Sequence, residues 1–152
     1  MRKILTFVVA LLIPFASIAE HHGPVEAEVR DAVIAFNGAY ANGEVDTYFG
    51  YYADDAMVYF YGARQDLMAY HDEWAEMVEA GGAVEKNELS DIRVQVMPSG
   101  DVAVASYFVD YRLRAPDGEI SASKAFESEV WRKIDDEWKI INLHYSEIPG
   151  QE

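Results

Sequence analysis

The stretch from residue 123 to residue 146 constrains the fold of this chain more than any other. β-Branched and aromatic residues fill two arms on either side of a polar turn at residues 135–137, which is typical of half-buried strands. The stretch therefore predicts a long antiparallel hairpin. Four polar residues lie inside its arms: Glu127, Glu129, Asn142 and His144. Each of them either faces water or lines a cavity, and this orientation decides whether it can belong to a functional site.

Residues 1–19 have the pattern of a secretory signal peptide. Two basic residues follow the first methionine, residues 4–15 are apolar, and small residues precede a cleavage point expected after Ala19. The apolar run is shorter than the roughly 20 residues that span a bilayer. We expect a periplasmic or secreted protein in which residues 20–152 form a single domain.

The composition is strongly acidic and contains no cysteine. Asp and Glu number 27 against 12 Lys and Arg, and the net charge is −15. Such a surface repels phosphate backbones and anionic lipid, so we expect neither nucleic acid nor, after signal cleavage, a membrane as partner. Without cysteine, the chain has no disulfide and no thiol chemistry.

No spacing of ligands typical of a zinc site occurs, and no glycine-rich phosphate loop is present. The prediction is therefore no metal and no cofactor. One alternative stays open. If cleavage follows Ala19, His22 becomes the third residue, and an amino terminus, two amides and this imidazole would suit Cu(II) or Ni(II).

The remaining pattern is helical first and β-rich afterwards. Apolar residues at three- and four-residue steps predict an amphipathic helix from Pro24 to Asn42. The further expected elements are a helix at 46–52, a strand at 56–61, a helix at 65–80, and strands at 85–97 and 102–114 before the hairpin. This order predicts an α+β domain.

Two stretches carry a resemblance to a known superfamily. Residues 41–58 combine Asn-Gly, a short helix and Ala-Asp-Asp-Ala, and residues 130–146 combine Val-Trp, a turn, Trp-Lys-Ile and His-x-Ser. The chain resembles the nuclear transport factor 2-like superfamily, and within it the SnoaL-like group and the calcium/calmodulin-dependent kinase II association domain. The resemblance implies a cone-shaped α+β fold, with three N-terminal helices packed on a strongly bent antiparallel sheet.

The resemblance also bears on single residues. The positions that hold the oxyanion donor and the base of ketosteroid isomerases read Phe36 and Phe60 here, which argues against that chemistry. The positions of the pocket arginines of the kinase association domain read Val109 and Glu129. Glu129 would favour a cation or a hydrogen-bond donor over an anion.

If the fold holds, the sheet and the first helix enclose a pocket. The odd-numbered side chains from Ala103 to Tyr111 are apolar or aromatic and are expected to line it. The expected ligand-binding residues are Tyr40, Tyr48, Tyr52, Tyr59, Trp74, Tyr107, Val109, Tyr111, Trp131 and Asn142. The expected acid–base residues are Glu129 and His144 on adjacent strands, supported by Asp110, with His71 as a more distant candidate. A purely structural role for these polar residues is an open alternative.

Three functions follow. The first is an exported homodimer, associating through the outer face of the sheet, that binds a small apolar, neutral or cationic molecule. The second is a cofactor-independent isomerase, cyclase or hydratase that uses Glu129 and His144. The third is an association module without catalysis.

Overall fold

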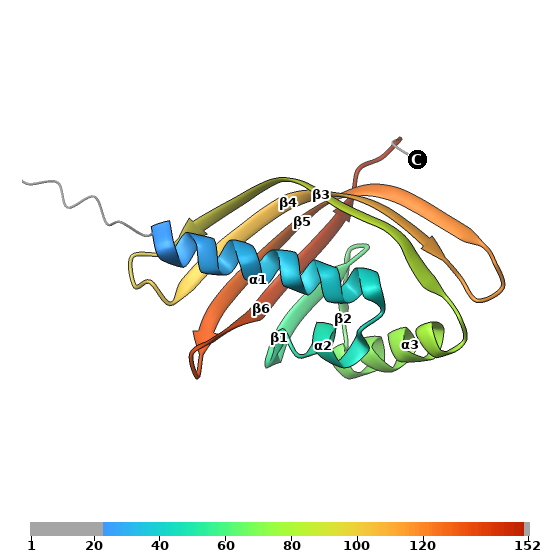
Figure 1. Ribbon diagram of the computed structural model, residues 1–152, viewed down its shortest axis with the longest axis horizontal. Helices are drawn as coiled ribbons and strands as arrows, with labels where there is room; N and C mark the ends of the chain where they lie inside the picture. The colour runs from blue at the N-terminus through green and yellow to red at the C-terminus, as the bar shows by residue number, and fades with distance from the viewer. Residues whose placement is uncertain (1–22, 151–152) are drawn as a thin grey trace, which may run out of the picture.

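The computed structural model describes residues 23–150, and Figure 1 shows one domain in which helices lie on the hollow side of a bent sheet. The helices are α1 (Gly23–Asn42), α2 (Val45–Phe49) and α3 (Leu67–Glu79). The strands are β1 (Tyr52–Phe60), β2 (Ala63–Gln65), β3 (Ala83–Val96), β4 (Val102–Arg114), β5 (Ile120–Ile134) and β6 (Glu137–Glu147). The expected α+β class and the three helices are confirmed. The signal peptide and His22 lie outside the described residues.

All six strands belong to one sheet, in the order β2-β1-β6-β5-β4-β3. The meander from β3 to β6 is antiparallel, as expected, but β1 pairs with β6 in parallel. The sheet is therefore mixed rather than wholly antiparallel. The parallel pair arises because the chain passes through α3 and the whole meander before it returns beside β1.

The C-terminal hairpin forms as expected. Ile134 pairs with Glu137 across a two-residue turn, and both turn residues, Asp135 and Asp136, have positive φ angles of 50° and 66°. Two successive positive φ angles are the conformation that lets a two-residue turn follow the twist of its strands, and Asp tolerates it.

The expected boundaries are least accurate around α2. This helix ends at Phe49, before the expected limit, and β1 already begins at Tyr52. The backbone N–H of Ile140 donates to the carbonyl oxygen of Tyr51 at 2.8 Å, so pairing with β6 draws this segment out of the helix. The short strand β2 was not expected from the sequence.

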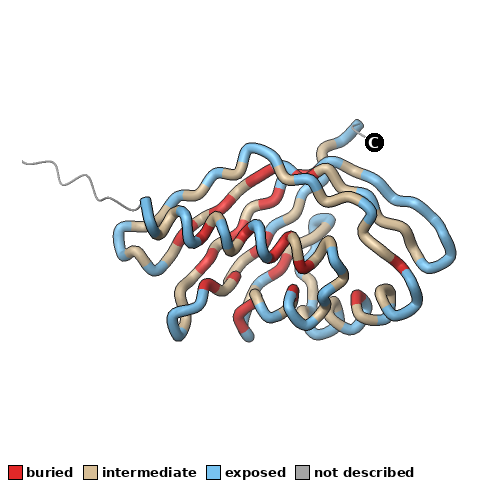
Figure 2. Tube along the Cα trace, viewed as in Figure 1, coloured by how far each residue is buried: buried red, intermediate tan, exposed pale blue. Residues whose placement is uncertain are grey.

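The solid core lies where α1 crosses the sheet, and Figure 2 shows buried residues along α1 and along the strands that it crosses. Val29, Val33 and Phe36 of α1 are at most 2% exposed. Ala103 and Ala105 of β4 are completely buried, and these short side chains let the helix lie close to the sheet. Within residues 23–150, no helix has the length and apolar character needed to cross a membrane.

Candidate functional site

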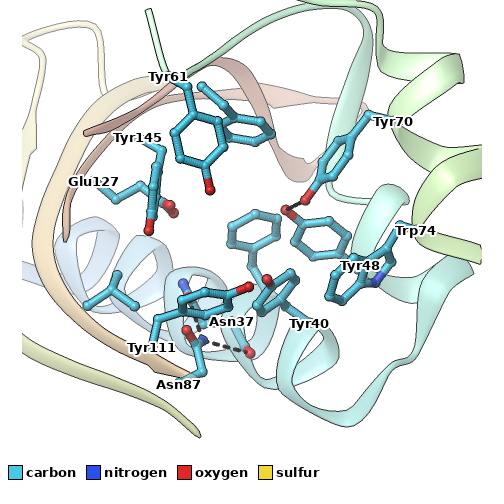
Figure 3. A pocket seen from close by; sticks show the side chains of 13 residues that line it. Asn37, Tyr40, Tyr48, Tyr61, Tyr70, Trp74, Asn87, Tyr111, Glu127 and Tyr145 are labelled. Carbon is cyan, nitrogen blue, oxygen red and sulfur yellow. Dashed lines mark hydrogen bonds between the residues drawn. The ribbon is translucent and has the colours of Figure 1, made fainter. Parts of the chain in front are cut away.

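The hollow side of the sheet leaves a cavity beside the C-terminal half of α1. Its volume is about 190 Å³, more than the roughly 150 Å³ of an apolar cavity that takes up benzene in another protein. Side chains from all three helices and from five strands border it. Nine of its thirteen lining residues are aromatic, and Figure 3 shows the rings around an open centre. The space suits a small molecule of about one ring.

Half of the expected ligand-binding residues line this cavity. They are Tyr40, Tyr48, Trp74, Val109 and Tyr111. Three others, Tyr52, Tyr107 and Trp131, are buried but do not border the space. The inward orientation of the odd-numbered side chains of β4 is confirmed, since Tyr107 and Val109 are buried while Phe108 is exposed. Their roles in binding stay predictions.

The other expected residues lie on the outer face of the sheet. Tyr59 pairs with His144, whose side chain is exposed, and Asn142 pairs with Met57. Asp110 forms an ion pair with Lys86 at 2.8 Å, which lowers the pKa of Asp110. The expected contact between Glu129 and His144 does not form. Tyr59 and Asn142 were expected to bind the ligand and Asp110 to support the acid–base pair, but none of the three lines the cavity.

A β-bulge accounts for this error. The register of β5 and β6 shifts between Val130, which pairs with Asn142, and Trp131, which pairs with Ile140, so Ile141 has no partner. An extra residue reverses the facing of every side chain beyond it. A regular hairpin would have placed Asn142 and His144 on the inner face. The bulge places Leu143 and Tyr145 there instead.

Glu129 does face inward, and its neighbour in the site is Glu127. Both carboxyl groups are buried, and Glu129 is completely so. The hydroxyl oxygen of Tyr107 hydrogen-bonds to Oε1 of both glutamates, at 2.6 Å from Glu129. The indole N–H of Trp131 donates to the second oxygen of Glu129 at 2.7 Å. The inner face of β5 therefore holds two carboxyl groups bridged by one phenol.

Counting protons shows that at least one of these carboxyl groups is protonated. The side-chain amide of Asn37 donates to the Tyr107 hydroxyl oxygen at 2.8 Å, and a phenol has a single hydrogen to donate. Tyr107 can donate to one glutamate only. The other glutamate must then donate its own proton to the Tyr107 oxygen, because two ionised carboxylates would leave one of these short contacts without a hydrogen.

Burial and mutual repulsion favour the same protonation. Burial raises the pKa of Glu129 well above its ordinary value, and the nearby charge of Glu127 adds to this rise. Burial also raises the pKa of Glu127. Because the rise in pKa is larger for the completely buried Glu129 than for Glu127, we assign the proton to Glu129, which leaves Glu127 as the carboxylate at the cavity wall. Figure 3 shows that carboxylate directed toward the open centre.

Two asparagines extend this network to the opposite wall. The amide N–H of Asn87 on β3 donates to Oδ1 of Asn37 at 3.0 Å, and Asn37 in turn donates to Tyr107 and to the carbonyl oxygen of Val33. Both asparagines line the cavity. The chain of hydrogen bonds fixes the orientation of Asn37, because its amide oxygen accepts from Asn87 while its amide nitrogen donates to Tyr107 and Val33.

A second polar group lies on the helical wall. The Tyr48 hydroxyl is 2.9 Å from that of Tyr52 and 3.1 Å from that of Tyr70. Burial raises the pKa of all three phenols well above the ordinary value, so they are neutral at physiological pH. Within residues 23–150, the indole N–H of Trp74 is a buried donor without a hydrogen-bond partner in the protein.

The residues that sequence reasoning missed are mainly the polar ones. Asn37, Tyr70, Asn87, Glu127 and Tyr145 line the cavity and were not expected there. A signal existed for Asn37, because it follows Val33 by four residues and so lies on the apolar stripe of the first helix. The position of Tyr145 depends on the bulge and has no comparable signal.

Positions singled out by the family resemblance also reach the cavity. Phe36, Phe60 and Val109 line it. Apolar side chains therefore occupy the positions of the oxyanion donor and the base of ketosteroid isomerases. An apolar side chain also occupies the position of a pocket arginine of the kinase association domain. Within residues 23–150, neither histidine lines the cavity. His71 instead contacts Asp72 at 3.1 Å and packs against Phe49. Within the described residues, no group of three or more His, Cys, Asp or Glu side chains could hold a metal ion.

A family model described as a SnoaL-like domain matches residues 29–151, which is most of the sequence. The chain belongs to the SnoaL-like family. Among curated proteins, none matches it significantly. The SnoaL-like identification agrees with the fold and with the resemblance carried by residues 41–58 and 130–146.

Solved structures share the fold at low sequence identity. The association domain of C. elegans CaMKII is 16% identical over 82% of this chain and 97% of that chain, with a TM-score of 0.66. An NTF2-like protein from Cytophaga hutchinsonii is 16% identical over 79% and 95%, with a TM-score of 0.68. A candidate dehydratase of the NTF2-like family from Streptomyces avermitilis is 17% identical over 84% and 99%, with a TM-score of 0.67. The nuclear transport factor 2-like fold is thus confirmed.

Proposed function

We propose that this SnoaL-like domain binds a small, largely apolar molecule in the cavity beside α1. The observation that carries the proposal is a space of about 190 Å³ with aromatic walls and a few converging polar groups, the usual form of a small-molecule site. Asn37, Asn87 and Glu127 would orient the ligand, while the rings would supply most of the contact area. We also propose that the protein is exported and acts without a cofactor.

Filling the cavity tests this function. Val109→Phe adds a ring at the cavity wall, whereas Val104→Phe adds the same ring on the outer face of the same strand. Saturation-transfer NMR would screen soluble one-ring alcohols, phenols and amines. We expect signals from bound compounds with the wild type and Val104→Phe, and their loss with Val109→Phe. Equal signals from the two variants, or none from the wild type, would refute binding at this site.

A specific observation favours acid–base catalysis as a second candidate. Glu127, Tyr107 and Glu129 form a hydrogen-bonded chain that ends at the cavity, so Glu127 could take a proton from carbon and return it to the same molecule without a cofactor. In this proposal Glu127, rather than His144, acts together with Glu129 as the acid–base pair. The test is deuterium exchange into the methyl group of acetophenone in D₂O. Wild-type protein should accelerate the exchange, and Glu127→Gln should not.

We further propose a homodimer that forms through the outer face of the sheet. Phe108 and Phe126 are 42% and 37% exposed there, and their ring centroids lie 5.6 Å apart. Exposed aromatic pairs of this kind are common at protein contacts. The domain would then present two independent cavities on opposite sides of the contact.

A further inference from the structure

The cavity contains negative charge but no positive charge. Glu127 is the one ionisable carboxyl group among the thirteen lining residues, and none of these is lysine, arginine or histidine. Across residues 23–150, no basic side chain lies within 4.0 Å of Glu127 or Glu129. The buried carboxyl pair thus lacks a countercharge.

Burying the Glu127 carboxylate without a nearby positive charge costs free energy of folding. Buried charges in proteins are normally paired, because the interior solvates an ion poorly. Here the stabilisation comes from one phenol, one indole and the proton retained on the pair. A positive group beside Glu127 would supply the missing countercharge without any change in the protein.

The walls also suit a positive group. The faces of tyrosine and tryptophan rings attract cations, and cages of such rings are used to recognise ammonium groups. Figure 3 shows Tyr61, Tyr111 and Tyr145 around the same open centre that the Glu127 carboxylate faces. Their hydroxyl oxygens add acceptors, and the net charge of −15 raises the concentration of cations near the protein.

We propose that the cavity takes a small organic monocation, an ammonium group on a compact apolar body, held between Glu127 and the surrounding rings. This rests on the proposed function and specifies its ligand class. An inorganic cation fits less well, because hard ions prefer several oxygen ligands whereas this wall is mostly aromatic carbon.

Cation binding should be linked to proton release. Besides Glu129 and Tyr107, the titratable groups that face Glu127 or share its open centre are all tyrosines: Tyr40, Tyr48, Tyr52, Tyr61, Tyr70, Tyr111 and Tyr145. Burial raises the pKa of each of these phenols, so they keep their protons at neutral pH and only the carboxyl pair titrates. A bound cation favours the ionised pair. Affinity should therefore rise with pH as the pair loses its remaining proton.

The test compares choline with 3,3-dimethylbutan-1-ol, in which a carbon atom replaces the charged nitrogen. Isothermal titration calorimetry on the whole protein at constant ionic strength should give at least about tenfold tighter binding of choline, with release of up to about one proton in buffers of different ionisation enthalpy. Glu127→Gln should remove most of this preference. Glu88→Gln, at an exposed outer position of β3, should retain it.

The outcomes separate the two proposals. Equal or tighter binding of the neutral alcohol by the wild type would overturn cation selection but leave small-molecule binding intact. A choline preference that survives in Glu127→Gln would place the cation elsewhere and also overturn it. If neither probe binds and one-ring compounds fail in the Val109→Phe comparison as well, the proposed function itself fails.

Discussion

The space between α1 and the sheet is solid at one end and hollow at the other. At the solid end, Val29, Val33, Trp131, Ile140 and Leu143 are at most 1% exposed. At the hollow end, tyrosines replace the aliphatic residues, and a cavity of about 190 Å³ remains. Helix α1 and strands β5 and β6 contribute to both regions, whereas α2 and α3 add aromatic walls at the hollow end.

The comparison shows how polar atoms keep a space open. Hydrocarbon side chains can relax partly into a gap, because no atom on them requires a hydrogen-bond partner. The hydroxyls of Tyr48 and Tyr70 are held by each other, and Asn37 is held by Tyr107 and Asn87. These hydrogen bonds fix the walls and prevent collapse. The hollow end is therefore expected to contribute less stability and more function.

Removing a large side chain should affect the two ends unequally. Trp131 is completely buried, and its ring centroid lies 6.0 Å from that of Phe36. Its indole N–H donates a hydrogen bond to Glu129. Trp131→Ala should lower the free energy of unfolding by about 3–5 kcal/mol. Trp74 stacks on Tyr40 but borders the cavity, so Trp74→Ala should cost roughly half as much or less. Urea denaturation measures both, and equal losses would contradict the comparison.

Glu129→Gln should change the pH dependence of stability. The pKa of Glu129 is raised by burial, so the folded state binds more protons than the unfolded state above the unfolded pKa. Stability should therefore be fully present below that unfolded pKa and be lost as pH rises toward the folded pKa, by at most about 1.4 kcal/mol per pH unit for one proton.

Gln keeps an acceptor for Trp131 and a donor for Tyr107, so the variant should lose this slope with little change near neutral pH. Glu137→Gln is the matched control, because Glu137 is exposed and its hydrogen bond with Lys139 lowers its pKa instead. Urea midpoints measured from pH 5 to pH 9 give the comparison. A wild-type slope that persists in Glu129→Gln would show that other groups cause it.

Substitutions on the outer face of the sheet should change self-association of the protein rather than its folding stability. Phe108→Ser combined with Phe126→Ser removes the exposed ring pair and should shift the protein toward monomer in sedimentation equilibrium. Its free energy of unfolding as a monomer should change by no more than about 1 kcal/mol. A wild type that is monomeric throughout the micromolar range would remove the basis of the dimer proposal.

The smallest effect is expected at His144. Its side chain is exposed on the face opposite Glu129, so His144→Ala should change stability by less than about 0.5 kcal/mol and leave ligand affinity unchanged. A loss of binding comparable to that of Glu127→Gln would mean that the two residues act together after all.

The sequence predicted most of the architecture because local patterns determine it. The alternation of β4 correctly gave Tyr107 and Val109 an inward orientation, and the polar turn at 135–137 correctly gave the hairpin. Apolar periodicity predicted the three helices. Each of these conclusions depends on periodicity or turn chemistry within one short segment, whereas the bend of the sheet was implied by the family resemblance.

The site was predicted only in part because its polar side depends on register. A regular hairpin would have brought His144 inward beside Glu129, and the unpaired Ile141 reverses this. The alternation of β6 gives no sign of a single extra residue. The partnership of Glu127 with Glu129 through Tyr107 also joins two strands, so it needed the register of β4 and β5.

The most direct test of the account is the titration of Glu127 and Glu129 by NMR of their side-chain carboxyl carbons. We predict that the ligand-free pair retains one proton above the ordinary carboxyl pKa, and that the carboxyl carbon of Glu129 titrates well above its ordinary value of 4.5. If both carbons titrate independently near that ordinary value, the two carboxylates are ionised and solvated at neutral pH, and the shared proton behind the cavity does not exist.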